Sequence, residues 1–264
     1  MMLRTKRIFM LLSLVCLAGN AMAEVVFSED FSDGKQDGWV LAGKSLANEI
    51  SVSGEALLLS STDTDPENNF SAVAAFPAVD LSVAGAKVTL ELDFQNMEDH
   101  AFQRGIAIGL YDSRETAITS DSEDEGAGKD DWGYYMYTRR FPFMHRLYEN
   151  NGKGILDASE SANRANDDEN ASIRVNRDSA VENVFGIADG QWHSFRLEIK
   201  AVQGPDGEVD LDVTLTVDEG HPTESVMTYR DGGVLMKRVD QIGLMSMKGN
   251  DFKVDNLKVT HLKP

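Results

Sequence analysis

The sequence predicts an all-β fold in which two antiparallel sheets pack face to face. Three observations support this prediction: short segments of alternating apolar and polar residues recur, turn-forming residues separate them, and no long window carries the 3.6-residue apolar spacing of a helix. Each strand of such a sandwich turns one face to the core and the other to water. The 264 residues are enough for one domain of this kind.

The predicted strands follow one another along the chain. Residues 50–59 alternate around Gly54 and predict a first hairpin, whereas 87–94 and 105–111 each place branched apolar residues at every second position. Further strands are expected over 132–140, 192–199, 209–217, 241–246 and 252–260. Glycine beside Asp or Asn, as at 231–233 and 249–251, marks the turns between strands.

The alternation is regular enough to assign a face to single residues. In 209–217 every odd position is Val or Leu and every even position is Asp or Thr, so Val213 is expected in the core. In 192–199 the side chains of Trp192, Ser194 and Arg196 lie on the face opposite His193. His193 is therefore interpreted as a structural core residue rather than a metal ligand, and the five His of the chain show no metal-ligand spacing.

Composition excludes some classes of function. The formal net charge is -19, from 44 Asp and Glu against 25 Lys and Arg, so no basic face is available to neutralise a nucleic-acid backbone. The same charge disfavours an anionic membrane surface as partner. Because 42% of the residues are hydrophobic, the chain can still build a packed core and is not an acidic disordered protein.

The first 23 residues have the pattern of an export signal. A basic start (Arg4, Lys6 and Arg7) precedes an apolar run over 8–18, and the small-x-small segment 21–23 predicts cleavage after Ala23. The only cysteine, Cys16, follows Val15 where a lipoprotein signal has a small residue, so simple cleavage is favoured over a lipid anchor. We expect a secreted or periplasmic protein without a membrane anchor, in which 24–264 form one domain.

Three short motifs resemble the concanavalin A-like superfamily of lectins and glucanases, in its laminin-G-like jelly-roll branch. The segment 27–39 resembles its opening strand, 189–195 (Asp-Gly-Gln-Trp-His-Ser-Phe) resembles its D-G-x-W-H turn and strand, and 252–259 resembles its closing strand. The resemblance implies an all-β, two-sheet antiparallel jelly-roll sandwich with the first and last strands adjacent. It also implies that Trp39 and Trp192, which lie in these motifs, are core residues.

Two catalytic interpretations follow from this resemblance. Glu91 and Asp93 partly resemble the E-x-D-x-x-E strand of jelly-roll glucanases, but Asn96 occupies the position of the general acid. These two acids are also the outward residues of an alternating strand, which is the simpler interpretation. A polysaccharide lyase would need a Tyr or His base, with Arg, Asn or Gln to neutralise a uronate carboxylate. Residues of the required types are Tyr134, Tyr137, Arg139, Arg140 and His145.

Sugar binding is favoured by the most aromatic segment of the chain, 132–148. Sugars stack their C–H faces on aromatic rings and hydrogen-bond planar polar groups, and both kinds of side chain alternate over 132–140. Only one face of this strand can be exposed in a sandwich. We expect a ligand to meet Trp132, Tyr134 and Arg140, with Tyr137, Arg139 and His145 as further candidates.

A structural calcium ion is the cofactor that the resemblance implies, since related jelly-roll modules commonly use one to tie the first strand to the last. The acids at matching places are Glu29, Asp30 and Asp255, and calcium takes about six to eight oxygen ligands. The alternating oxygen side chains of 63–69 are a second candidate. That segment lacks the glycine and the terminal glutamate of an EF-hand and contains Pro66.

The sequence as a whole predicts an exported, lectin-like carbohydrate-binding protein. A polysaccharide lyase or glycoside hydrolase on the same fold is the alternative. A structural or adhesion module that binds a protein partner is a further alternative.

Overall fold

The computed structural model describes residues 23–43, 48–62, 69–96, 105–122, 131–139, 144–151, 173–175, 190–222, 224–232, 236–247 and 251–264. Its strands, in chain order, are β1 (Glu24–Glu29), β2 (Trp39–Ala42), β3 (Asn48–Val52), β4 (Leu57–Ser61), β5 (Asn69–Asp80), β6 (Lys87–Asn96), β7 (Gly105–Asp112), β8 (Trp132–Arg139), β9 (Met144–Asn151), β10 (Ile173–Val175), β11 (Trp192–Gln203), β12 (Val209–Val217), β13 (Ser225–Asp231), β14 (Arg238–Met247) and β15 (Phe252–Leu262). The described part of the chain contains no helix, and hence none that is long and apolar enough to cross a membrane.

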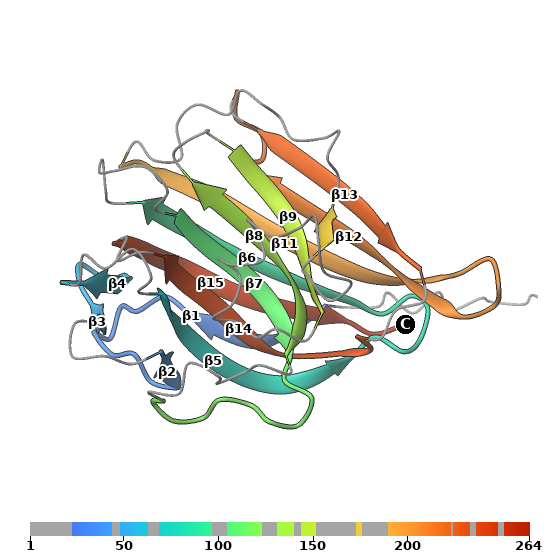
Figure 1. The fold of residues 1–264 in the computed structure, drawn as a ribbon, viewed down its shortest axis with the longest axis horizontal. Helices are drawn as coiled ribbons and strands as arrows, with labels where there is room; N and C mark the ends of the chain where they lie inside the picture. Colours follow the sequence, from blue (N-terminus) through green and yellow to red (C-terminus); the bar gives the residue numbers. More distant parts are fainter. Residues whose placement is uncertain are drawn as a thin grey trace, which may run out of the picture.

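The strands form two antiparallel sheets, which confirms the predicted sandwich. Sheet A has the order β13-β12-β11-β6-β15-β4-β3, with β1 also paired to β15, and sheet B has the order β10-β9-β8-β7-β14-β5-β2. Figure 1 looks through both layers and shows their strands running in similar directions, as in an aligned sheet packing. The first and last strands are neighbours as expected, since Phe27 pairs with Val259.

The main core lies between the two sheets. Every strand of the predicted alternating series contributes its apolar face. Leu90 of β6 and Val213 of β12 from sheet A belong to the same core cluster as Ile108 of β7 from sheet B, and all three are fully buried. Trp39 is also buried there, against the rings of Phe27 and Phe31, as predicted. The period-two pattern of the sequence is therefore the pattern of the core.

A second, smaller apolar cluster lies on the other side of sheet B. It consists of Ala42, Val73, Ala107, Tyr111, Ile118, Tyr135, Tyr137 and Met245. Tyr111 and Tyr135 stack at 6.4 Å between ring centroids, and their rings are nearly parallel. Sheet B is thus buried on both faces at β7 and β8, which is why these strands carry apolar residues at successive positions.

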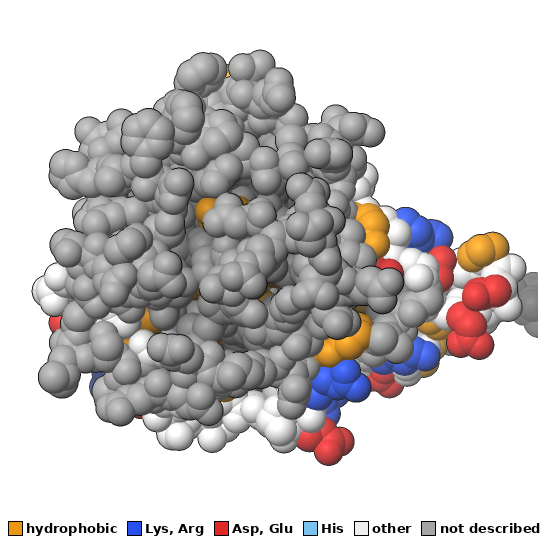
Figure 2. Space-filling model, in the orientation of Figure 1, with side chains coloured by type: hydrophobic (Ala, Val, Ile, Leu, Met, Phe, Trp, Pro, Cys, Tyr) orange, Lys and Arg blue, Asp and Glu red, His pale blue; other side chains and the backbone are white. Residues whose placement is uncertain are grey.

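Many charged side chains pair at the surface, whereas Asp210, Asp231 and Asp240 are buried. Where described residues are visible in the space-filling view, acidic and basic side chains lie next to one another along the side of the molecule (Figure 2). Examples are the pairs Arg230–Asp212, at 2.6 Å, and Lys263–Glu24, at 2.8 Å. Ion pairs of this kind partly offset the acid excess of the chain, so an acidic side chain without a basic partner is a distinctive feature of a surface.

Candidate functional site

The predicted ligand face of β8 points into the molecule, and this part of the prediction is wrong. Tyr134 is only 1% exposed and belongs to the core between the sheets, where its hydroxyl donates a hydrogen bond of 2.5 Å to Asp231 Oδ2. Trp132 is half-buried and packs against the same core, with the Arg114 guanidinium 5.2 Å from its ring centroid. The inter-sheet space needs large side chains at this position, and the aromatic residues fill it.

The opposite register of β8 faces away from that core, but it is buried as well. Tyr135 and Tyr137 are 0% and 4% exposed and belong to the second cluster. Arg139 and His145 lie on β8 and β9, with only their backbone described, and Arg140 lies outside the described residues. Among the predicted sugar-binding residues whose side chains are described, Tyr134 and Tyr137 are therefore buried and do not form an exposed platform with Trp132.

The predicted calcium ligands are engaged in local turns. Glu29 accepts the amide of Phe31, and Asp30 and Asp255 accept the amides of Ser32 and Asn256. Within the described ranges, no group of three or more His, Cys, Asp or Glu side chains is placed to hold a metal ion. The predicted set does not fit a calcium site, and most of the candidate segment 63–69 lies outside the described residues.

The chemistry of Tyr134 also bears on the lyase alternative. Burial, together with the adjacent Asp231 carboxylate, raises the pKa of the Tyr134 phenol far above its ordinary value. The proton stays on the phenol because the charged form would lie in the core beside another negative charge. Tyr134 is therefore a hydrogen-bond donor to Asp231 and unsuited to act as a general base.

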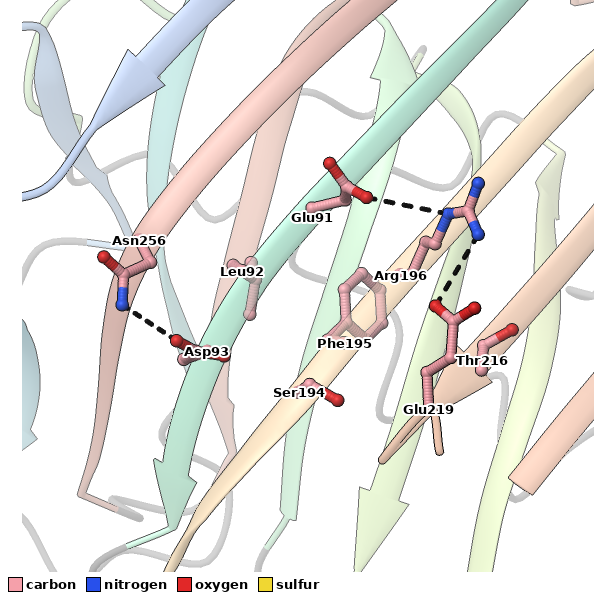
Figure 3. Close-up of a pocket in the computed structure, with 9 residues that line it drawn as sticks. All are labelled: Glu91, Leu92, Asp93, Ser194, Phe195, Arg196, Thr216, Glu219 and Asn256. Carbon is pink, nitrogen blue, oxygen red and sulfur yellow. Dashed lines mark hydrogen bonds and ion pairs between the residues drawn. The ribbon is translucent and has the colours of Figure 1, made fainter. Parts of the chain in front are cut away.

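A pocket on the outer face of sheet A was not predicted. Nine residues from β6, β11, β12, β15 and the turn after β12 line it (Figure 3): Glu91, Leu92, Asp93, Ser194, Phe195, Arg196, Thr216, Glu219 and Asn256. Leu92 and Phe195 also belong to the core, and the alternation of β6 and β11 turns Glu91, Asp93, Ser194 and Arg196 to the other side. The pocket thus lies over the central strands of the sheet.

Arg196 lies at the centre of a charge network in this pocket. Its guanidinium nitrogens are 3.2 Å from Glu198, 3.6 Å from Glu219 and 3.7 Å from Glu91. Antiparallel pairing brings Arg196 opposite Glu91 on β6, and Asp218, with a φ of 55°, turns the chain after β12 so that Glu219 reaches the guanidinium. The arginine is about one-third exposed, so a ligand can reach it.

An irregularity in β15 places a polar amide at the other end of the pocket. The pairing of β15 with β6 shifts register between Asp255 and Lys258, and Asn256 takes a left-handed backbone conformation with a φ of 52°. Its side-chain amide donates a hydrogen bond of 2.8 Å to Asp93 Oδ2 (Figure 3). The pocket therefore combines carboxylates, an amide, a guanidinium and the hydroxyls of Ser194 and Thr216.

An exposed aromatic ring lies next to these polar groups. Trp192 is 46% exposed, so the prediction that it belongs to the core is wrong. It begins β11 two residues before Ser194 and lies on the same face of that strand, paired with Gln95 of β6. The alternation of 192–199 already contained this signal, because it placed Trp192 opposite the core-facing His193.

The neighbours of Ser194 do not form a hydrolytic triad. His193 is buried on the core side, where its Nδ1 lies 2.9 Å from Asp218 Oδ2 and its ring packs against Phe94. Consecutive residues of a strand point to opposite faces, so the Ser194 hydroxyl and the His193 ring are separated by the sheet. His193 is structural, as predicted, and it supports the end of the strand that carries Trp192 and Ser194.

Comparison with known proteins identifies the fold. No protein-family model and no curated protein matches the sequence. Among solved structures, lectin II from Ulex europaeus is similar with a TM-score of 0.53 at 12% identity, over 92% of this chain and all of that one. The Emp47p carbohydrate recognition domain has a TM-score of 0.51 at 12% identity, over 90% of this chain and 94% of its own.

A third similar structure is the lectin UEA-II complexed with galactose, with a TM-score of 0.50 at 11% identity over 92% of this chain and 99% of that one. At identities this low, the comparison speaks to the fold. The chain has the concanavalin A-like, lectin-like jelly-roll fold that its opening, D-G-x-W-H and closing motifs predicted.

Proposed function

We propose that this protein is an exported carbohydrate-binding protein of the lectin type, and that its glycan lies across the outer face of sheet A. One observation carries the proposal: the exposed ring of Trp192 lies on the same face of the sheet as a pocket lined by hydrogen-bonding side chains. The lectin-like fold is consistent with it but does not locate the site.

The pocket and the ring of Trp192 beside it together offer both kinds of contact that a sugar ring requires. The exposed indole of Trp192 is a flat apolar surface on which the C–H face of a pyranose can stack. The carboxylate of Asp93 accepts hydrogen bonds from hydroxyl groups, whereas the amide of Asn256 and the guanidinium of Arg196 donate and orient them. Since these groups are already held by one another, they are preorganised for a ligand.

Export is part of the same proposal. Residues 1–23 support export, because a basic start, an apolar run and a small-x-small segment follow one another as in a cleaved signal peptide. The absence of cysteine after residue 16 means that the exported fold relies on its packed core and not on disulfides.

The test is a glycan array followed by calorimetric titration of the best ligand. We expect Trp192→Ala to weaken binding by about 1–3 kcal/mol, as for other exposed aromatic anchors, while the thermal midpoint changes little. Trp192→Phe keeps a flat ring and should retain most of the affinity. Val83→Ala removes another exposed apolar side chain, in the turn between β5 and β6, and should leave binding unchanged.

Two results would count against the proposal. If the wild-type protein binds no glycan, carbohydrate binding itself is wrong. If Trp192→Ala binds as well as the wild type, the ligand lies elsewhere and this surface is not the site. Repeating the array with a chelator tests the calcium prediction separately, because a glycan held by the pocket residues alone should bind equally well without divalent ions.

A further inference from the structure

We propose that the glycan bound at this pocket carries a positively charged amino group, so that its class is an oligosaccharide of amino sugars with free amines. This inference rests on the proposed function and refines it. Its basis is the unequal pairing of charges among the residues that line the pocket, together with the exposed ring beside them.

Arg196, the cation among the described residues that line the pocket, is already paired with carboxylates, and so are two lysines near it. Lys87 lies 2.9 Å from Glu198, Lys258 lies 3.8 Å from Glu91, and the Arg196 guanidinium is shared among three glutamates. An anionic sugar would have to displace these carboxylates to reach the Arg196 guanidinium. The pocket is therefore poorly suited to uronates or sulfated sugars.

The carboxylate of Asp93 is the one acid of the pocket that no cation offsets among the described residues. Its Oδ2 accepts a single hydrogen bond from the neutral amide of Asn256, and it takes part in no ion pair within the described part of the chain. A carboxylate has about four acceptor positions, so it can take further N–H donors. An ammonium group supplies three such donors and a full positive charge.

The surroundings of Asp93 add to the negative potential. Asp255 pairs with Asp93 across β15 and β6, and burial, followed by the charges of Asp93, Asp30 and Glu55, raises the pKa of the Asp255 carboxyl. Acidic side chains thus converge at the end of the pocket marked by Asn256. A cation that binds there relieves this repulsion, and a neutral hydroxyl does not.

The exposed indole of Trp192 favours the same ligand. The negative face of an aromatic ring attracts cations such as ammonium groups, and Trp is the strongest of the aromatic residues in this respect. Trp192 precedes Ser194, which pairs with Asp93, by two residues on the same face. One amino sugar can therefore stack on the ring while its ammonium group, or that of the next sugar, meets the carboxylate.

The experiment compares three soluble probes on the full exported chain by calorimetry: a glucosamine oligosaccharide with free amines, the same oligosaccharide fully N-acetylated, and an oligogalacturonate. We expect the free-amine probe to bind about tenfold more tightly than the acetylated one, and the uronate not to bind. Raising the salt concentration should weaken the binding of the free-amine probe more than that of the acetylated probe, because salt screens the attraction between the ammonium group and the Asp93 carboxylate.

Asp93→Asn and a matched control locate the effect. Asp93→Asn should weaken the free-amine probe about fivefold to tenfold more than the acetylated probe, because the amide oxygen can still accept hydrogen bonds from hydroxyl groups but carries no charge to pair with an ammonium group. Asp212→Asn removes the same charge from a residue of β12 that pairs with Arg230, outside the pocket lining. It should leave the binding of both probes unchanged, and thermal midpoints of both variants verify folding.

The outcomes separate this inference from the proposed function. If the acetylated and free-amine probes bind equally and both need Trp192, the site is a glycan site and the amino-group inference is wrong. If tetralysine binds as tightly as the free-amine probe, the pocket recognises cations on peptides and the inference is wrong. If neither these probes nor any glycan on the array binds, the proposed function fails together with the inference.

Discussion

Replacing Tyr134 by Phe removes one hydroxyl from the core and leaves a buried acid short of a partner. The phenol donates a hydrogen bond of 2.5 Å to Asp231 Oδ2, and both residues are almost fully buried. Phe fills nearly the same volume, so the change creates no large cavity. A hydrogen bond to a charged group contributes about 1.5–3 kcal/mol, and we expect the free energy of unfolding to fall by about 2–3 kcal/mol at neutral pH.

The size of this loss should depend on pH with a defined sign. Burial is the main cause that raises the pKa of Asp231 above its ordinary value of 3.8; nearby Asp210 raises it further, whereas the Tyr134 hydrogen bond lowers it. The folded protein therefore binds a proton at Asp231 more tightly than the unfolded chain does, and protonation of Asp231 stabilises the fold. This contribution to stability is fully present below pH 3.8 and is lost as the pH rises through the pKa of Asp231 in the folded state. Tyr134→Phe raises that pKa further, so its cost is largest when Asp231 is charged.

Urea denaturation followed by tryptophan fluorescence measures the difference between wild type and variant at about pH 7 and about pH 4. We expect the deficit to shrink by about 1 kcal/mol at the lower pH, because a hydrogen bond to a neutral carboxyl is weaker. Tyr229→Phe is the control, since its hydroxyl lies 3.5 Å from Glu149 and is less buried. A deficit independent of pH, or no greater than that of Tyr229→Phe, would refute the reasoning.

The remaining predictions concern the core and export. Val213→Asp buries an unpaired carboxylate at a fully buried position and should abolish the β-sheet circular dichroism signal, whereas Thr214→Asp, one residue along on the outward face, should leave the fold intact. A folded Val213→Asp protein would contradict the assigned register. Mass spectrometry of the exported protein should show an N-terminus at Glu24; a lipid-modified chain starting at Cys16 would show an anchored lipoprotein instead.

The strands that could be predicted are those with one face in the core and the other exposed to solvent. In β12 the apolar and polar positions alternate without exception, and the burial of Val213 and Leu215 follows from the sequence. In β8, aromatic residues occupy successive positions. The alternation rule predicts one core face and one exposed face for such a strand, but here both faces are buried because sheet B is covered on both sides. Alternation identifies two faces of a strand and does not state what covers each of them.

The pocket on sheet A could be predicted only in part, for a different physical reason. Local alternation turns Trp192, Ser194 and Arg196 to one side of β11 and Glu91 and Asp93 to one side of β6, and the sequence shows both facts. That these two sides are adjacent depends on pairing between strands about one hundred residues apart, which no local pattern encodes.

The Asn256 amide, which β15 contributes to the pocket, depends on a bulge that the sequence does not show. Regular pairing would have placed residue 256 with its side chain on the core side, opposite that of Asp255. The register shift between Asp255 and Lys258 and the left-handed conformation of Asn256 instead bring its amide to Asp93. Asn accepts this conformation more readily than most residues because its short polar side chain can hydrogen-bond locally. A change at Asn256 therefore alters the backbone as well as the amide, whereas Asp93→Asn changes one charge and leaves the bulge in place.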